Sequence, residues 1–176
     1  MKGNADTPDM SEDVIRLKGC ISSFEKGCWI GASDAEAMIR SYDYARFEDP
    51  LMFQTEGLSY RISSEGIHVE PIYSMGRAKY EALRRGCVMK ARAIMSELPD
   101  TSDRRMLVGL HSYICDNIRY RHVQDAHEAV GPLIRGTGVC EGISKMVKVV
   151  CDIAGVPCHL AVSSTDGPDS DQCGIW

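Results

Sequence analysis

The sequence lacks any apolar run near the roughly 18 residues that a membrane-spanning helix needs, so we expect no membrane partner. It also lacks an excess of basic residues: 20 lysines and arginines stand against 25 aspartates and glutamates, for a net charge of −5. This balance argues against a protein that binds nucleic acid through bulk charge. The polar, acidic N-terminus has no signal-peptide core, which predicts a cytoplasmic protein.

No Cys-x-x-Cys pair occurs among the eight cysteines, so the ligand spacing of a zinc ribbon is absent. Without a secretion signal, the thiols are expected to stay reduced, and most of them to be small buried hydrophobic residues. We therefore expect no metal and no other cofactor. A small metal-binding or redox protein is kept as an alternative, although no spacing of cysteine and histidine supports it.

What the sequence does contain is an ordinary globular mixture, with 44% hydrophobic and 26% charged residues over 176 positions. That length suits one domain with a small annex. We divide the chain into a disordered leader at 1–13, an annex of one helix and a β-hairpin at 14–73, and a core at 74–176. Within 14–31, three glycines leave the secondary structure ambiguous.

The annex is predicted to contain one helix. Ser33 and Glu36 match a capping box, which predicts a helix that reaches about Arg46 and is ended by Asp49-Pro50. Its spacing predicts a buried face made of Ala35, Met38, Ile39 and Tyr42.

A β-hairpin is predicted after this helix. Apolar and polar residues alternate over 58–62 and again over 67–69, with a turn at 63–66 between them. Pro71 has no N–H to donate, so it confines the second strand to an edge or an end of a sheet.

Two helices are predicted at the start of the core. An apolar stripe over 80–98 predicts a long helix, which Pro99 ends. A cap at Thr101 or Ser102 then begins a second helix that reaches about Asn117. A polar loop from 121 to 129 follows.

Cys140 stands at the start of a further predicted helix, behind a glycine-rich approach at 131–138. The helix runs to Ala154, where Gly155 and Pro157 provide the stop. Its predicted buried face consists of Ile143, Met146, Val147, Val150 and Ala154, and a strand is predicted at 158–162.

The N-terminus of a helix is a favourable place for a nucleophilic thiol. The reactive form is the thiolate, which the helix dipole and the unpaired first-turn N–H groups stabilise. The same N–H groups can bind the oxyanion that forms when a thiolate attacks a carbonyl. Cys140 is therefore the nucleophile candidate among the eight cysteines, the alternative being a buried cysteine at a helix start.

The stretch from Gly136 to Lys145, the helix that follows and the segment 154–157 together resemble the nucleophile motif of the transglutaminase-like family. Residues 110–120 look like the helix that precedes this motif. Residues 47–53 and the hairpin after them resemble the N-terminal annex of bacterial members. The resemblance covers residues 35–163.

The resemblance implies a papain-like α+β fold in which the nucleophile helix packs on an antiparallel sheet. It implies that Cys140 attacks a carboxamide or peptide carbonyl, and that the acyl group then passes from sulfur to an amine or to water. It also implies a histidine on the strands after the helix as activator of the thiol, with an aspartate that orients it. The expected partner is a protein or peptide substrate.

The sequence departs from the family pattern in its last residues. The family's histidine stands two residues before a tryptophan, but Gly174 holds that place before Trp176, and no aspartate matches the orienting residue. We therefore expect a core without its C-terminal strands and a weak or inactive chain. An unpaired edge at the strand 158–162 would favour self-association. The alternative function is a non-catalytic protein- or peptide-binding module that keeps the fold.

Three further histidines stand near the motif. His159 lies on the strand predicted after the nucleophile helix and is a candidate substitute base. His122 and His127 lie in the loop before the motif, where they either line the entrance of a cleft or are solvated loop residues.

Two pairs with helical i, i+4 spacing complete the candidates. His111 and Cys115 fit either half of a metal site or ordinary packing. Glu141 and Lys145 are predicted to form an ordinary stabilising pair on the nucleophile helix.

Overall fold

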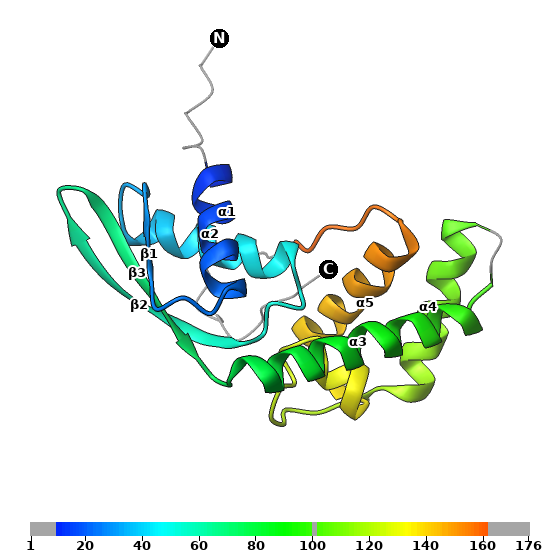
Figure 1. The fold of residues 1–176 in the computed structure, drawn as a ribbon. Coiled ribbons are helices and arrows are strands. Elements are labelled where there is room, and N and C mark those ends of the chain that lie inside the picture. The colour runs from blue at the N-terminus through cyan, green and yellow to red at the C-terminus, as the bar shows by residue number, and fades with distance from the viewer. Residues whose placement is uncertain (1–9, 100–101, 162–176) are drawn as a thin grey trace, which may run out of the picture. The chain divides into compact units, whose positions relative to one another are not determined.

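The chain forms two units, Met1–Ala78 and Lys79–Trp176, and the computed structural model describes residues 10–99 and 102–161 (Figure 1). Helices and a small antiparallel sheet make up most of the described residues, which confirms the predicted α+β class. No helix in these two ranges has both the length and the hydropathy to cross a membrane.

The first unit begins with helix α1, Met10–Ser22, so the prediction of a disordered leader is wrong for residues 10–13. Residues 1–9 lie outside the described part of the chain. Leu17 and Ile21, four residues apart, are fully buried and turn one face of α1 toward the core. The burial of this face favours a helix despite Gly19. The segment left ambiguous by its glycines therefore holds most of α1, followed by the short strand β1, Cys28–Ile30.

Helix α2, Ala35–Glu48, has a different cap from the one predicted. The N-cap is Asp34 and not Ser33, because the Asp34 carboxylate accepts a hydrogen bond from the Ala37 N–H at 2.8 Å. This hydrogen bond lowers the pKa of Asp34 below its usual value. The helix also continues two residues beyond Arg46, to Glu48.

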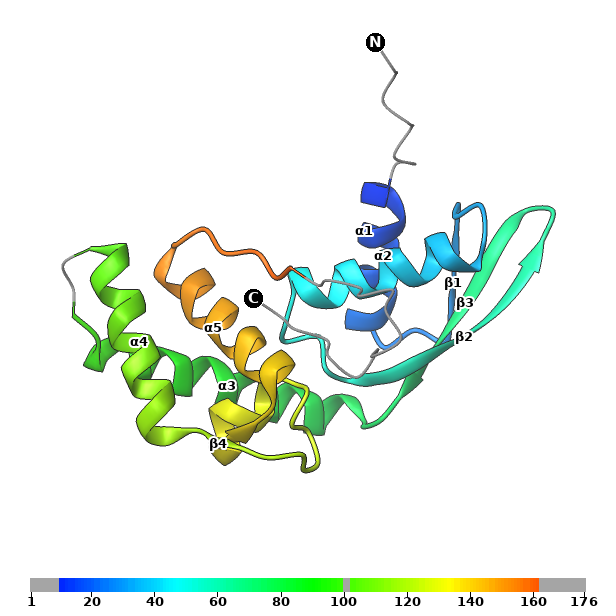
Figure 2. The same cartoon turned by 180° about the vertical axis from the view of Figure 1, so that it is seen from behind.

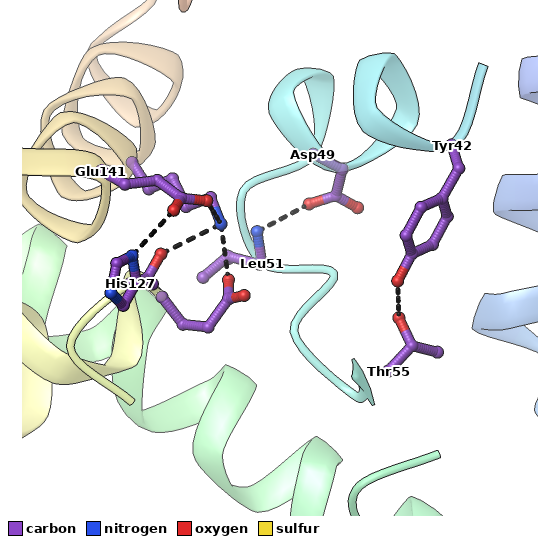
Figure 3. A network of polar contacts seen from close by, with 8 residues as sticks. Tyr42, Asp49, Leu51, Thr55, His127 and Glu141 are labelled. Atoms are coloured by element: carbon purple, nitrogen blue, oxygen red, sulfur yellow. Dashed lines mark hydrogen bonds and ion pairs between the residues drawn. The ribbon is translucent and has the colours of Figure 1, made fainter. Parts of the chain in front are cut away.

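The buried face of α2 is only partly the predicted one. Met38 and Tyr42 are buried, but Ile39 is 49% exposed. The other buried residues are Ala37, Ser41 and Ala45, and the rotation of about 100° per residue places Ile39 beyond the edge of this face. The buried Tyr42 hydroxyl lies 2.9 Å from Thr55 Oγ1, a hydrogen bond drawn in Figure 3.

The sheet of the first unit contains the predicted hairpin, formed by β2, Thr55–Ser63, and β3, Gly66–Tyr73. Figures 1 and 2 show it as a long ribbon. The strand order is β1-β3-β2, so β3 is central. β1 pairs with residues 67–69 of β3 and does not reach Pro71. In the described residues, β3 at Pro71 therefore pairs with β2 on one side and with no strand on the other. Pro71 thus has the local position of an edge residue, as its missing N–H requires.

The two helices and the sheet enclose the core of the first unit. Its buried members come from α1, α2, β1, β3 and the loops on either side of α2. They are Val14, Leu17, Ile21, Ile30, Ala32, Ala37, Met38, Tyr42, Ala45, Met52, Ile67 and Val69.

The second unit contains two long helices that confirm the sequence prediction. Helix α3, Arg77–Glu97, buries the side chains of Tyr80, Cys87, Ala91 and Ile94 along one stripe. Helix α4, Asp103–Asn117, is capped by Ser102, whose hydroxyl accepts a hydrogen bond from the Arg105 N–H at 3.4 Å. The buried residues of α4 are Met106 and Leu110.

The segment after α4 contains structure that the sequence did not predict. Strand β4, Arg119–Tyr120, pairs in parallel with β5, Thr137–Gly138. A single π-helical turn, η1, Gly131–Arg135, precedes β5. The next helix, α5, Cys140–Ala154, ends at Gly155 in the left-handed conformation (φ +74°). The predicted bounds of this helix are confirmed.

The strand predicted at 158–162 is wrong for the part that the structure describes. Residues 156–161 have no regular secondary structure, because no second strand pairs with them there, and Val162 lies outside the described range. The strands described in the second unit are the short parallel pair β4–β5, whereas the antiparallel sheet belongs to the first unit. Self-association through an edge at 158–162 stays a prediction.

The buried face of α5 also extends further than predicted. Met146 and Val150 are buried as expected, while Ile143, Val147 and Ala154 are half-buried. Two lysines, Lys145 and Lys148, are buried in addition. Such burial requires polar partners from outside the helix, which a helical pattern alone does not reveal.

Candidate active site

Cys140 is the first residue of α5 and is half-buried. The N-cap, Val139, is extended, and in the described chain no side chain caps this end of the helix. The first helical hydrogen bond runs from the Ile143 N–H to the Val139 carbonyl oxygen at 2.9 Å. The first-turn amides and the positive end of the helix dipole are therefore directed at the position that the sequence assigned to the nucleophile.

The parallel pair β4–β5 positions the chain that enters α5. The Arg119 N–H donates to the Gly136 carbonyl oxygen at 2.9 Å, and the Arg121 N–H donates to that of Gly138 at 3.2 Å. Gly136 has a left-handed backbone (φ +65°), which a glycine adopts without strain. These contacts fix the last residues before Cys140.

A loop packs closely against the first turn of α5. The Val139 N–H donates to the Ala126 carbonyl oxygen at 3.0 Å. A Cβ atom at Gly142 would lie 2.2 Å from the same oxygen, closer than any real contact. Only glycine therefore allows this approach, which explains why a glycine follows Cys140 at the second position.

This loop brings His127 to the nucleophile helix. His127 Nδ1 lies 3.0 Å from Glu141 Oε2, the interaction drawn in Figure 3. The His127 side chain is nevertheless 59% exposed. His127 is thus an exposed loop residue, as one of its two sequence interpretations has it. The other interpretation, that it lines the entrance of a cleft, stays a prediction.

Lys145 is the most buried charged side chain near the site, with 1% exposure. Its ammonium lies 2.7 Å from Glu141 Oε1 and 2.9 Å from Glu128 Oε2, and it donates to the His127 carbonyl oxygen at 3.0 Å. The predicted Glu141–Lys145 pair is confirmed. Its burial and its link to the loop were missed, because Glu128 and His127 come from a separate segment.

The remaining candidate histidines have weaker surroundings. The His122 ring lies 6.2 Å from that of His127, without a described carboxylate partner. His111 and Cys115 do face each other, with the sulfur 3.9 Å from the ring nitrogens, but both are exposed rather than packed. No cluster of three metal-ligating side chains occurs in residues 10–99 and 102–161. His159 is exposed and lies in the irregular segment 156–161 after α5. It is therefore not on a strand of the described residues, and the strand was the reason for considering it as a base.

Burial separates several other cysteines from a reactive role. The seven cysteines in the described ranges are thiols and not disulfides. Burial raises the pKa of Cys20, Cys87 and Cys151 to about 12, so these thiols are protonated at neutral pH. A protonated, buried thiol is a poor nucleophile.

Together these features define an α+β protein with a cysteine at the start of a helix and a glycine-dependent loop packed on that helix. A family model of the transglutaminase-like superfamily matches residues 88–176, half of the chain. The chain belongs to this superfamily, which confirms the resemblance seen around Cys140. No curated protein matches the chain. The resemblance of residues 47–53 and the hairpin after them to the annex of bacterial members lies outside the matched range and stays a prediction.

Proposed function

We propose that Cys140 is the nucleophile of a thiol-dependent acyl transfer or hydrolysis on a protein or peptide substrate. Membership of the transglutaminase-like superfamily supports this class of chemistry. The observation that carries the assignment to Cys140 is its place as first residue of α5, where the helix has no side-chain cap in the described chain. An anionic sulfur or oxyanion there meets the positive end of the helix.

The proposed reaction has two stages. The Cys140 sulfur attacks the carbonyl carbon of a carboxamide or peptide bond, and the first-turn N–H groups receive the oxyanion. The C–N bond then breaks, the amine leaves with a proton, and the acyl group remains on sulfur. An amine or a water molecule attacks this thioester, which releases the product and returns the thiol.

The reactivity of Cys140 tests this assignment directly. The folded protein is treated with a limiting amount of iodoacetamide at neutral pH, and the modification of each cysteine is followed by mass spectrometry. We expect Cys140 to be alkylated faster than Cys20 and Cys28, and also faster than the exposed Cys115. Cys115 is the critical control, because it is more accessible than Cys140 but lies in the last turn of α4. The unpaired first-turn N–H groups that face Cys140 are therefore absent around Cys115.

A second readout follows the acyl-enzyme itself. Brief treatment with 4-nitrophenyl acetate should add one acetyl group at Cys140, and the Cys140→Ala variant should lose that modification. If Cys140 is alkylated no faster than Cys115 and forms no acetyl adduct, the proposal is wrong. The fold would then be that of a protein- or peptide-binding module.

A further inference from the structure

The end of α5 that lies away from Cys140 brings two other cysteines together. Cys151 is in the last turn of the helix and is 1% exposed, whereas Cys158 is in the irregular segment after the helix and is half-buried. Both carry free thiols. Because they are seven positions apart in the chain, their proximity depends on how the chain turns after the helix.

The chain reverses its direction at the end of α5. Gly155 adopts the left-handed conformation (φ +74°), which ends the helix. The Val156 N–H donates to the Cys151 carbonyl oxygen at 2.9 Å, so the returning segment is bound to the residue that carries the first thiol. Figures 1 and 2 both show the chain turning back after this helix.

Lys148 holds the returning segment on the face of α5 that carries Cys151. Lys148 and Cys151 are three residues apart and both are buried, so their side chains are neighbours on the helix. The Lys148 ammonium donates to the Cys158 carbonyl oxygen at 3.2 Å and lies 2.9 Å from an oxygen of Asp152. A buried ammonium is costly unless it is paired, so these contacts favour a position of Cys158 beside Cys151.

The thiols of Cys151 and Cys158 meet in this arrangement. Burial first, and then the charge and the hydrogen bond of the Cys158 thiol, raise the pKa of Cys151 to about 12. The hydrogen bond between the thiols agrees with the main-chain contacts, which bring the same two residues together. Two thiols that already meet can be joined with little movement of the backbone.

We propose that Cys151 and Cys158 form a reversible disulfide when the protein meets a low-molecular-weight disulfide such as oxidised glutathione, and that this bond locks the end of α5. The inference does not depend on the proposed function of Cys140, which lies at the other end of the same helix. It assigns a site of oxidative modification to two cysteines that the proposed acyl transfer does not use.

The more accessible thiol reacts first. The Cys158 thiol loses its proton and its sulfur attacks one sulfur of oxidised glutathione, whose S–S bond breaks; one glutathione leaves and takes up that proton. The Cys151 thiol then loses its proton and its sulfur attacks the Cys158 sulfur, which releases the second glutathione as a thiol. Two protein thiols are oxidised to one disulfide, and one glutathione disulfide is reduced to two thiols. An excess of reduced thiol reverses both steps.

The burial of Cys151 suits the second step and not the first. Its thiol is shielded from a dissolved disulfide and is protonated at neutral pH. A mixed disulfide on Cys158 nevertheless places a reactive sulfur directly beside it, and this proximity offsets the small fraction of thiolate. Removal of Cys151 should therefore trap glutathione on Cys158.

The test treats four folded proteins with oxidised glutathione at neutral pH, namely the unaltered chain, Cys151→Ala, Cys158→Ala and Cys87→Ala. The remaining thiols are blocked with iodoacetamide, and the chain is cleaved after its basic residues and before its aspartates. This cleavage leaves Cys151 in peptide 149–151 and Cys158 in peptide 152–165, which stay joined only through a disulfide. Mass spectrometry then identifies linked peptides and bound glutathione.

Cys87→Ala is the matched control for Cys151→Ala. Cys87 is also buried in a helix, at 0% exposure, and burial raises the pKa of its thiol to about 12 as well. It lies in α3, outside the turn that follows α5. A general effect of removing a buried thiol should appear in both variants, whereas trapped glutathione on Cys158 should appear only in Cys151→Ala.

We expect the unaltered chain and Cys87→Ala to form the Cys151–Cys158 link and to retain no glutathione on Cys158. Cys151→Ala should retain one glutathione on Cys158, and Cys158→Ala should leave Cys151 unmodified. Native-state hydrogen exchange should show the amides of the last turn of α5 exchanging about tenfold more slowly in the oxidised unaltered chain, because the disulfide restricts the opened state. If Cys151→Ala fails to fold, the unaltered chain decides by itself.

Several outcomes overturn the inference. If the folded chain forms no Cys151–Cys158 link, if glutathione stays on Cys158 while Cys151 is present, or if Cys158 is linked to another cysteine, the two thiols are not a disulfide site. If the link forms but hydrogen exchange at the end of α5 is unchanged, the disulfide does not lock the helix. None of these results bears on the alkylation of Cys140, so the proposed function fails or stands separately.

Discussion

Replacing Gly142 with alanine should destabilise α5, although alanine is the better helix former. The new Cβ atom would lie 2.2 Å from the Ala126 carbonyl oxygen and 3.1 Å from the Glu128 carbonyl oxygen. Overpacking typically costs about 1–3 kcal/mol, and here the obstructing atoms are backbone, so no side-chain rotation relieves the contact. The gain in helix propensity is about 1 kcal/mol at most. With the cost at the upper end of that range, about 3 kcal/mol, we expect a net loss of about 2 kcal/mol.

Native-state hydrogen exchange measures this loss where it occurs, because the opening free energy of α5 is read from its own amides. The control is Gly19→Ala in α1, where an added Cβ meets nothing within 4 Å. That variant should be neutral or more stable by up to about 1 kcal/mol in α1. If the α5 amides of Gly142→Ala exchange no faster than those of the unaltered chain, the loop does not pack on the first turn as described.

Two further predictions concern ionisable groups. Because the hydrogen bond from Ala37 lowers the pKa of Asp34, its stabilisation of α2 is fully present above the ordinary pKa of an aspartate and is lost as the pH falls through the lowered value. An acid titration of helical circular dichroism should show this loss, and Asp34→Ala, which has no carboxylate, should not. Because burial raises the pKa of Cys87 to about 12, Cys87 should react with iodoacetamide far more slowly than the exposed Cys115 until the protein is unfolded, and fast reaction of native Cys87 would contradict its position in the core.

The sequence predicted those elements whose determinants are local. The helix from Cys140 to Ala154 was predicted with correct bounds, because its apolar spacing lies within it and Gly155 directly follows it. The hairpin was predicted for the same reason, since its alternation and its turn are adjacent. The cap of α2 was misplaced by one residue, because Ser33 and Asp34 are both capping residues and their backbone conformation decides between them.

The elements that the sequence did not predict depend on partners from other segments. β4 and β5 are two residues each, too short for any alternation, and they exist through their pairing with one another. Residues 158–161 have a strand-like pattern but no pairing strand in the described chain.

The candidate site divides in the same way. Cys140 could be identified from its own helix and its glycine-rich approach. The burial of Lys145 and the contact of His127 with Glu141 could not, because both require the fold of the preceding loop. A lysine within the apolar half of α5 was the one sequence signal that pointed to partners outside the helix.

The pairing of β4 with β5 makes the position of Cys140 independent of the length of the loop after β4. Residues 121–124 are exposed and lie between two anchors, the hydrogen bond of Arg121 to Gly138 and that of Ala126 to Val139. Lengthening a loop between fixed ends costs only about 0.6 kcal/mol per doubling of its length. Insertions between these anchors can therefore lengthen the loop that leads to His127 without moving Cys140, at little risk to the fold.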